Sequence, residues 1–354
     1  IKAVMDAPVN DPAQDLRRMK ARASVLIALA DLGGVWSVEE VTGALTRFAD
    51  LAVQTALEAA IGAQVRRGKL PGQTEDDVPR AGGLCVLAMG KMGAHELNYS
   101  SDIDLICLFD ETRFDPDDYA DARTAFVRAV RIMCQTLSER TADGYVFRTD
   151  LRLRPDASVT PVAMSMEAAE RYYESFGRTW ERAAFIKARA SAGDIEAGER
   201  FLETLRPFVW RRHLDYAAIQ DAQDMRLRIR DHKGLHQKPS HLGHDLKLGS
   251  GGIREIEFFT QTRQLISGGR DPDLRASRTV EALGQLADKG WVNPGDAEQL
   301  VADYRAHREA EHRVQMVADQ QTHVLPETEE DFAQLAALSG REPSSYAAEI
   351  EERL

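Results

Sequence analysis

The sequence predicts an α+β fold, in which a small mixed β-sheet follows a helical segment and precedes a helical bundle. Two apolar runs, 84–89 (LCVLAM) and 103–109 (IDLICLF), have the length of strands and are too short for full helices. Apolar residues recur at helical spacing before these runs and again from residue 166 onward. The order strand, turn, strand, helix, strand between 84 and 154 indicates a mixed sheet with helical cover.

Length and composition fit a protein of two or three domains with a substantial core. The chain has 354 residues, of which 43% are hydrophobic. We expect a helical segment over 1–75, a sheet-containing domain over 76–195 and a helical bundle over 196–354. The chain starts without Met and stops inside a polar helical pattern, so it resembles a piece of something longer.

The charge and the cysteines narrow the class of protein. The net charge of −12 disfavours binding to nucleic acid, since proteins that neutralise phosphates usually have a basic surface. Cys85, Cys107 and Cys134 all fall in apolar segments, which favours buried thiols in a reducing cytoplasm. We find no apolar run of about 18 residues and no signal sequence, so no membrane segment is predicted.

The first half of the chain contains clear helix and strand signals. The pattern predicts helices over 11–32 and from Ser37 to about residue 65, separated by Gly33-Gly34, and a loop over 69–83. A helical stripe runs from Tyr119 to Leu137. After the Asp143-Gly144 turn, residues 145–154 (YVFRTDLRLR) alternate with period two and predict a strand.

The second half reads as helices. Their expected ranges are about 165–176, 178–191, 197–208, 215–232, 253–266, 277–289, 294–318 and 328–338. The glycine-rich GSGG at 249–252 opens one of them. Four histidines in the preceding loop suggest zinc, but no cysteine accompanies them, and we favour a polar loop; they are His232, His236, His241 and His244.

The segment between the first two strands contains the candidate catalytic residues. Gly90 and Gly93 stand where the first strand turns, and glycine allows a ligand phosphate to approach the backbone. Asp102 and Asp104 lie one residue apart, so on a strand both carboxylates point to one side. Two charges about 4 Å apart repel by roughly 1–4 kcal/mol. A divalent metal such as Mg²⁺ removes that cost and usually serves phosphate chemistry.

Asp150 supplies a third acid from the strand expected at 145–154. Three carboxylates converging from two neighbouring strands would suit Mg²⁺ ions that act on a phosphate. The alternative is that Asp150 forms a salt bridge with Arg148 or Arg152, and for Asp150 alone this alternative is slightly favoured.

The run GKMGAHELNYSSDIDLICLFD (90–110) resembles the nucleotidyltransferase signature of bacterial glutamine synthetase adenylyltransferases. These bifunctional adenylyltransferase/adenylyl-removing enzymes belong to the DNA polymerase β-like superfamily. The likeness continues through further ordered motifs at 144–157, 178–190, 205–219 and 247–261. It implies a polymerase β-like nucleotidyltransferase core.

The resemblance also implies a reaction. Such enzymes resemble tandem copies of this domain, of which one copy adds AMP to a tyrosine of glutamine synthetase and the other removes it. The wordings ELNYSSDID and GGIREIEF are similar to the amino-terminal, adenylyl-removing half. The expected reaction is Mg²⁺-dependent phosphorolysis, in which phosphate attacks and ADP leaves. The alternatives are the ATP-dependent adding half, or a non-catalytic module that docks glutamine synthetase or a PII-type signal protein.

By resemblance, Asp102, Asp104 and Asp150 are the catalytic and metal-binding acids, and Gly90, Lys91, Gly93 and Ser101 line the phosphates. The attacking phosphate is an anion and needs cationic side chains to bind it. The candidates are Arg152, Arg154, Lys187, Arg189, Lys247 and Arg254. The backbone N–H groups around Gly251 could bind an anion, or the glycines could simply form a tight loop. Glu181, Glu255 and Glu257 are expected to be salt-bridge partners on helix surfaces; the alternative is that one of them touches a metal or ribose.

Overall fold

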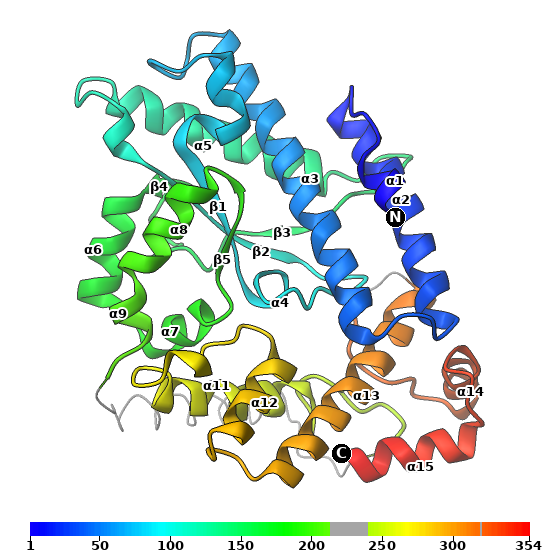
Figure 1. Cartoon of the computed structure of the whole chain (residues 1–354). Coiled ribbons are helices and arrows are strands. Elements are labelled where there is room, and N and C mark those ends of the chain that lie inside the picture. The colour runs from blue at the N-terminus through cyan, green and yellow to red at the C-terminus, as the bar shows by residue number, and fades with distance from the viewer. Residues whose placement is uncertain (213–239, 319–320) are drawn as a thin grey trace. The chain divides into compact units, whose positions relative to one another are not determined.

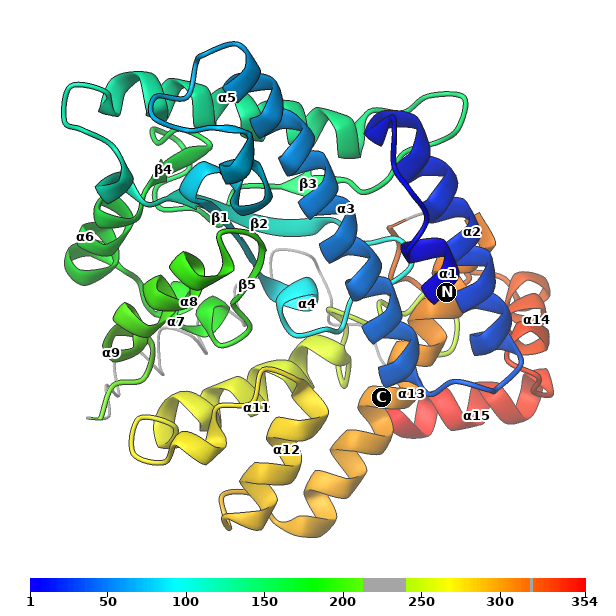
Figure 2. The same ribbon diagram turned by 45° about the horizontal axis from the view of Figure 1, so that its top comes forward.

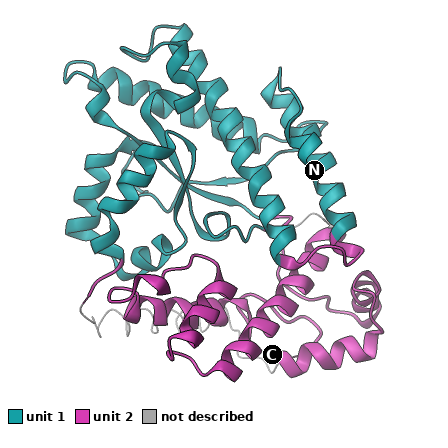
Figure 3. Ribbon diagram, viewed as in Figure 1, with its two compact units in different colours: residues 1–30, 39–97, 101–209 teal, residues 31–38, 98–100, 210–354 magenta. Residues whose placement is uncertain are grey.

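The structure is a computed structural model that describes residues 1–212, 240–318 and 321–354. The chain forms two compact units, which Figure 3 colours separately. The first contains 1–30, 39–97 and 101–209, and the second contains 31–38, 98–100 and the described part of 210–354. The helix expected at 215–232 and the residues His232 and His236 lie outside the described residues. In the described part of the chain, no helix is long and apolar enough to cross a membrane.

After the short helix α1 (Lys2–Met5), the chain forms the two long helices that the sequence predicts. They are α2 (Pro12–Leu32) and α3 (Val38–Arg66). The α3 helix buries a continuous stripe that includes Phe48, Val53 and Leu57. The expected loop at 69–83 contains a 3₁₀ segment, η1 (Glu75–Gly83).

The first unit is built on a mixed sheet, which confirms the predicted α+β class (Figure 1). The β1 (Leu84–Ala88) and β2 (Ile103–Phe109) strands pair antiparallel, and β5 (Arg189–Gly193) pairs antiparallel with the other edge of β1. Two short strands, β3 (Thr149–Asp150) and β4 (Ala163–Ser165), both pair in parallel with β2. The strand order is therefore β3-β2-β1-β5, with β4 also on β2.

Helices surround this sheet on several sides (Figures 1 and 2). α5 packs against β3 and β4, α6 against β4, and α8 against β1 and β5. The remaining short helices are α4, η2, α7 and α9. The bounds are α4 (Gly90–Gly93), η2 (Glu111–Arg113), α5 (Tyr119–Ser138), α6 (Met166–Phe176), α7 (Thr179–Phe185), α8 (Ile195–Thr204) and α9 (Arg206–Val209).

Two secondary-structure predictions are wrong. The strand expected over 145–154 is only two residues long, because the chain turns after Asp150 and the Arg154 guanidinium bonds the carbonyls of that turn. The helix expected to run to 191 ends at Phe185, and the next residues form β5. The small residues of 190–193 allow close pairing with β1, and this tertiary contact overrides local helix propensity.

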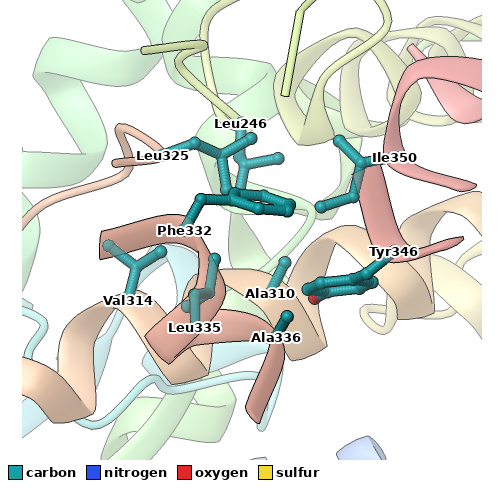
Figure 4. Close-up of a cluster of buried hydrophobic side chains, with 9 residues drawn as sticks. All are labelled: Leu246, Ala310, Val314, Leu325, Phe332, Leu335, Ala336, Tyr346 and Ile350. Atoms are coloured by element: carbon teal, nitrogen blue, oxygen red, sulfur yellow. The ribbon is translucent and has the colours of Figure 1, made fainter. Parts of the chain in front are cut away.

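The second unit is helical, as predicted. Its described helices are α11 (Ile253–Ser267), η3 (Pro272–Leu274), α12 (Thr279–Asp288), α13 (Pro294–Ala318), α14 (Glu329–Leu338) and α15 (Pro343–Arg353). One part of its core lies around Phe332 and Tyr346, whose rings stack 5.8 Å apart (Figure 4). A second cluster joins α11, α12 and α13 through Ile256, Leu283 and Tyr304.

Candidate active site

The acidic pair begins the central strand as the sequence predicts. Ile103 and Leu105 are fully buried, whereas Asp102 and Asp104 are only partly buried, which is the alternation expected of a strand. The register of the parallel pair β2·β3 sets Asp104 opposite Asp150. Neighbouring strands lie about 4.8 Å apart, so these two carboxyl groups come from adjacent backbone positions.

Gly90 lies against this acidic group. Its φ is +53°, and a Cβ atom at this position would meet Asp104 Oδ2 at 3.0 Å. The turn is also tied to the same strand by the N–H of Met89, which donates to the carbonyl of Asp104 (2.9 Å). Glycine is therefore required here for its backbone conformation and for the close approach of a carboxylate.

Two arginines pair with two of the three acids, Asp102 and Asp150. Arg148 Nε donates to Asp102 Oδ1 at 2.6 Å, and Arg152 Nε donates to both oxygens of Asp150 at 3.0 and 2.9 Å. The hydrogen bond from Arg152 lowers the pKa of Asp150. The pKa of Arg152 is raised first by this bond, and the charges of Asp104 and Asp102 also raise it. Arg152 is thus a cation in the field of all three carboxylates.

The donors suit Mg²⁺ in their chemistry, because all three are carboxylate oxygens. Among the described residues, no group of three or more His, Cys, Asp and Glu side chains is arranged to hold a metal ion. The salt bridge between Asp150 and Arg152, which the sequence leaves open as an alternative, is formed. The Arg152 side chain in this pair is 84% exposed, whereas that of Asp150 is 14% exposed.

Several expected phosphate ligands of the first unit already have structural partners. Lys187 is buried and pairs with Glu96 at 2.8 Å. Arg154 donates to the carbonyls of the turn after β3. Arg189 pairs with Asp50 at 2.6 Å.

Gly93 serves packing, because a Cβ there would lie 1.8 Å from the Lys187 carbonyl oxygen. Lys91 lies on α4, and Ser101 directly precedes Asp102 in the sequence. Both side chains are half-buried.

Three further candidates belong to the second unit. The GSGG segment does precede α11, whose N-cap is Gly252. Gly251 has a φ of +75°, and a Cβ there would lie 2.1 Å from the Leu354 carbonyl oxygen. Arg254 is exposed and lies 3.6 Å from Glu257, while Lys247 is half-buried.

Sequence reasoning missed some buried acids. Glu181 and Glu257 are 2% and 4% exposed, so the expectation that they lie on helix surfaces is wrong. Glu181 caps its own helix by accepting from the N–H of Arg178 at 2.8 Å. The buried partner of Lys187, Glu96, was also missed; its only signal was an acid within the segment 90–110.

The described histidines of the expected loop have no metal-like arrangement. His241 contacts Glu351 at 2.7 Å and Glu329 at 3.1 Å. His244 is buried, and burial lowers its pKa.

Comparison with known proteins places the sheet and its acids in a family. The family model described as glutamate-ammonia ligase adenylyltransferase matches residues 1–204, more than half of the chain. The chain belongs to this family. The resemblance drawn from the sequence motifs is therefore confirmed, and the family is one of nucleotidyltransferase enzymes. A second model, described as GlnD PII-uridylyltransferase, matches residues 223–354.

Similar full-length proteins carry one common name, bifunctional glutamine synthetase adenylyltransferase/adenylyl-removing enzyme. The protein from Bradyrhizobium diazoefficiens is 52% identical over 341 residues, covering 96% of this chain and 34% of the relative. The Rhizobium meliloti protein is 50% identical, with 93% and 33% covered, and the Caulobacter vibrioides protein is 51% identical, with 92% and 33% covered. The chain spans about a third of the length of these relatives.

Proposed function

We propose that this chain removes AMP from a tyrosine of adenylylated glutamine synthetase by phosphorolysis. The observation that carries the proposal is the register of Asp104 with Asp150, beside Gly90 and two residues after Asp102. Family membership supports the reaction class, and the relatives' common name includes an adenylyl-removing activity. The wordings ELNYSSDID and GGIREIEF favour the removing half.

The chemistry is an in-line displacement at the AMP phosphorus. An oxygen of inorganic phosphate forms the new P–O bond, the bond to the tyrosine oxygen breaks, and the products are ADP and free tyrosine, which takes up a proton. The phenol has a pKa of about 10, so its oxygen is a fair leaving group without a strong general acid.

We propose Asp102, Asp104 and Asp150 as the residues that hold Mg²⁺. When bound, Mg²⁺ would supply charge neutralisation for the phosphoryl oxygens. Arg148 orients Asp102 through its 2.6 Å hydrogen bond. If Asp150 held Mg²⁺, the guanidinium of Arg152, which donates to Asp150 in this structure, would be available to bind a phosphate oxygen. Glycine at position 90 lets the backbone approach the same phosphate.

We also propose the partners. Adenylylated glutamine synthetase is the substrate, by analogy with the names of the relatives. A PII-type signal protein is the proposed regulator, supported by the similarity of residues 223–354 to a PII-uridylyltransferase model. We propose that the other catalytic activity in the relatives' name lies in the part of them that this chain does not span.

The direction of the reaction can be tested with one protein preparation. Purified chain is given adenylylated glutamine synthetase with phosphate and Mg²⁺, and in parallel the unmodified synthetase with ATP and Mg²⁺. We expect ADP and unmodified tyrosine from the first mixture only. Turnover in the second mixture alone would assign the adding reaction to this chain. Binding of the synthetase without turnover in either mixture would indicate a regulatory module.

A further inference from the structure

The α13 helix buries an unusual number of polar side chains. His307, Arg308, Glu311, His312 and Arg313 are all at most 4% exposed. Burying charges costs several kcal/mol per ion unless each finds partners. Such a group therefore needs an explanation beyond the packing of the helical bundle.

Three consecutive residues of the segment 90–110, namely 98–100, contact side chains of α13 or their partner Asp31. Asn98 is fully buried, and its Oδ1 accepts from Arg308 Nη2. The Tyr99 hydroxyl donates to Asp31 Oδ2 at 2.9 Å, and its ring meets the His312 ring edge-on at 5.3 Å. The N–H of Ser100 donates to Gln315 Oε1 at 3.0 Å. The segment 98–100 is held by a different group at each residue.

Two of the groups that hold this segment, Arg308 and Asp31, are themselves fixed by ion pairs. Arg308 Nε lies 3.2 Å from Glu311, which lies 2.7 Å from His323 Nδ1. Arg313 Nη1 lies 2.8 Å from Asp31 Oδ1, on the other oxygen from the Tyr99 contact. Interlocked networks of this kind hold their members in one arrangement.

We propose that Arg308, Asp31 and Gln315 are positioning residues for the acidic pair. They fix 98–100 within the helical unit, and only Ser101 separates this clamped segment from Asp102. The clamp thereby sets the start of β2 and the position of the carboxylates that follow. The catalytic importance of that position rests on the proposed function.

The test uses paired substitutions that remove or keep one acceptor. Asn98→Ala removes the acceptor for Arg308, and Asn98→Asp keeps an oxygen there. Gln315→Leu removes the acceptor for the Ser100 N–H, and Gln315→Glu keeps it. The control is Gln264→Ala, at another buried glutamine of the same unit, whose amide bonds the carbonyls of Leu274 and Ala276.

Hydrogen exchange over 101–105 is the first readout, and it needs no activity. The N–H of Ile103 is bonded to the carbonyl of Arg148 (2.9 Å), so its protection reports the start of β2. We expect the exchange rate there to rise about tenfold in Asn98→Ala and Gln315→Leu. In Asn98→Asp and Gln315→Glu it should return to the wild-type rate. Gln264→Ala should lower Tm without changing this exchange. Unchanged hydrogen exchange over 101–105 in both Asn98→Ala and Gln315→Leu would overturn the proposed clamp.

Phosphorolysis kinetics are the second readout. We expect kcat to fall roughly 10- to 100-fold in Asn98→Ala and Gln315→Leu, while the KM for glutamine synthetase is unchanged. In Asn98→Asp and Gln315→Glu, kcat should recover. A fall of kcat in Gln264→Ala equal to that in Asn98→Ala would show a general loss of stability and overturn the positioning role. If the wild-type chain releases no ADP, the proposed function fails, while the exchange measurement still decides the clamp.

Discussion

At the residue scale, Gly90 allows the backbone to lie close to the carboxylate of Asp104. A left-handed φ costs a residue with a side chain roughly 1–2 kcal/mol, and at Gly90 a Cβ would also press on Asp104. Gly68 provides a matched comparison. Its φ is +62°, but a Cβ there would meet nothing within 4 Å.

We predict that Gly90→Ala and Gly68→Ala each lower the free energy of unfolding by about 1 kcal/mol. Only Gly90→Ala should also slow phosphorolysis, by roughly tenfold or more, since it displaces a carboxylate. Urea denaturation and ADP release measure the two effects. Equal activity of the two variants would show that the approach of Gly90 to Asp104 has no catalytic role.

The buried histidines predict a pH dependence of stability. Burial lowers the pKa of His244 and of His307 below the ordinary value of 6.5. The unfolded chain therefore takes up these protons first, and stability is lost as the pH falls through about 6.5 toward the folded-state pKa values. His241 acts in the opposite sense, because its hydrogen bond to Glu351 raises its pKa.

We predict a lower Tm at pH 5.5 than at pH 7.5, and a smaller difference in His307→Gln. Thermal unfolding at the two pH values, followed by circular dichroism, measures it. A Tm that rises on acidification would mean that other groups dominate.

At the scale of elements, the β1–turn–α4 segment and its neighbour β5 explain what sequence could and could not predict. The apolar runs of β1 and β2 and the spacing of Asp102 and Asp104 are local signals, and the structure follows them. β5 depends on pairing with β1 from about 100 residues away, so a helical local pattern misled the prediction. The cationic candidates were recognised by charge alone, which cannot reveal a partner such as Glu96 for Lys187.

The ion pair between Lys187 and Glu96 allows the predicted phosphate role of Lys187 to be separated from a structural one. We predict that Lys187→Met lowers stability by about 3–5 kcal/mol, because it removes the cation 2.8 Å from a buried carboxylate. Adding Glu96→Leu should restore most of that loss. Denaturation gives the stability of each variant, and the KM for phosphate is measured on the stable double variant.

If the pair is only structural, the double variant keeps the KM of the wild type for phosphate. A large rise of that KM in a stable double variant would instead assign Lys187 to the phosphate site.

At the scale of the whole molecule, the chain passes between two units through short segments. One of these, 98–100, leads directly to the acids of β2. Local sequence patterns identified both kinds of architecture, the sheet and the bundle. They could not show that a stretch of the nucleotidyltransferase signature is held by α13, because those contacts join residues more than 200 positions apart.

The central claim is that Asp104 and Asp150 act together on a phosphate. The most direct measurement is the rate of ADP release from adenylylated glutamine synthetase by Asp104→Asn and Asp150→Asn, with Asp117→Asn in an exposed loop as the control. We predict losses of roughly 10²- to 10³-fold for the first two with unchanged Tm, and a wild-type rate for the third. Full activity in a folded Asp104→Asn or Asp150→Asn variant would contradict the account.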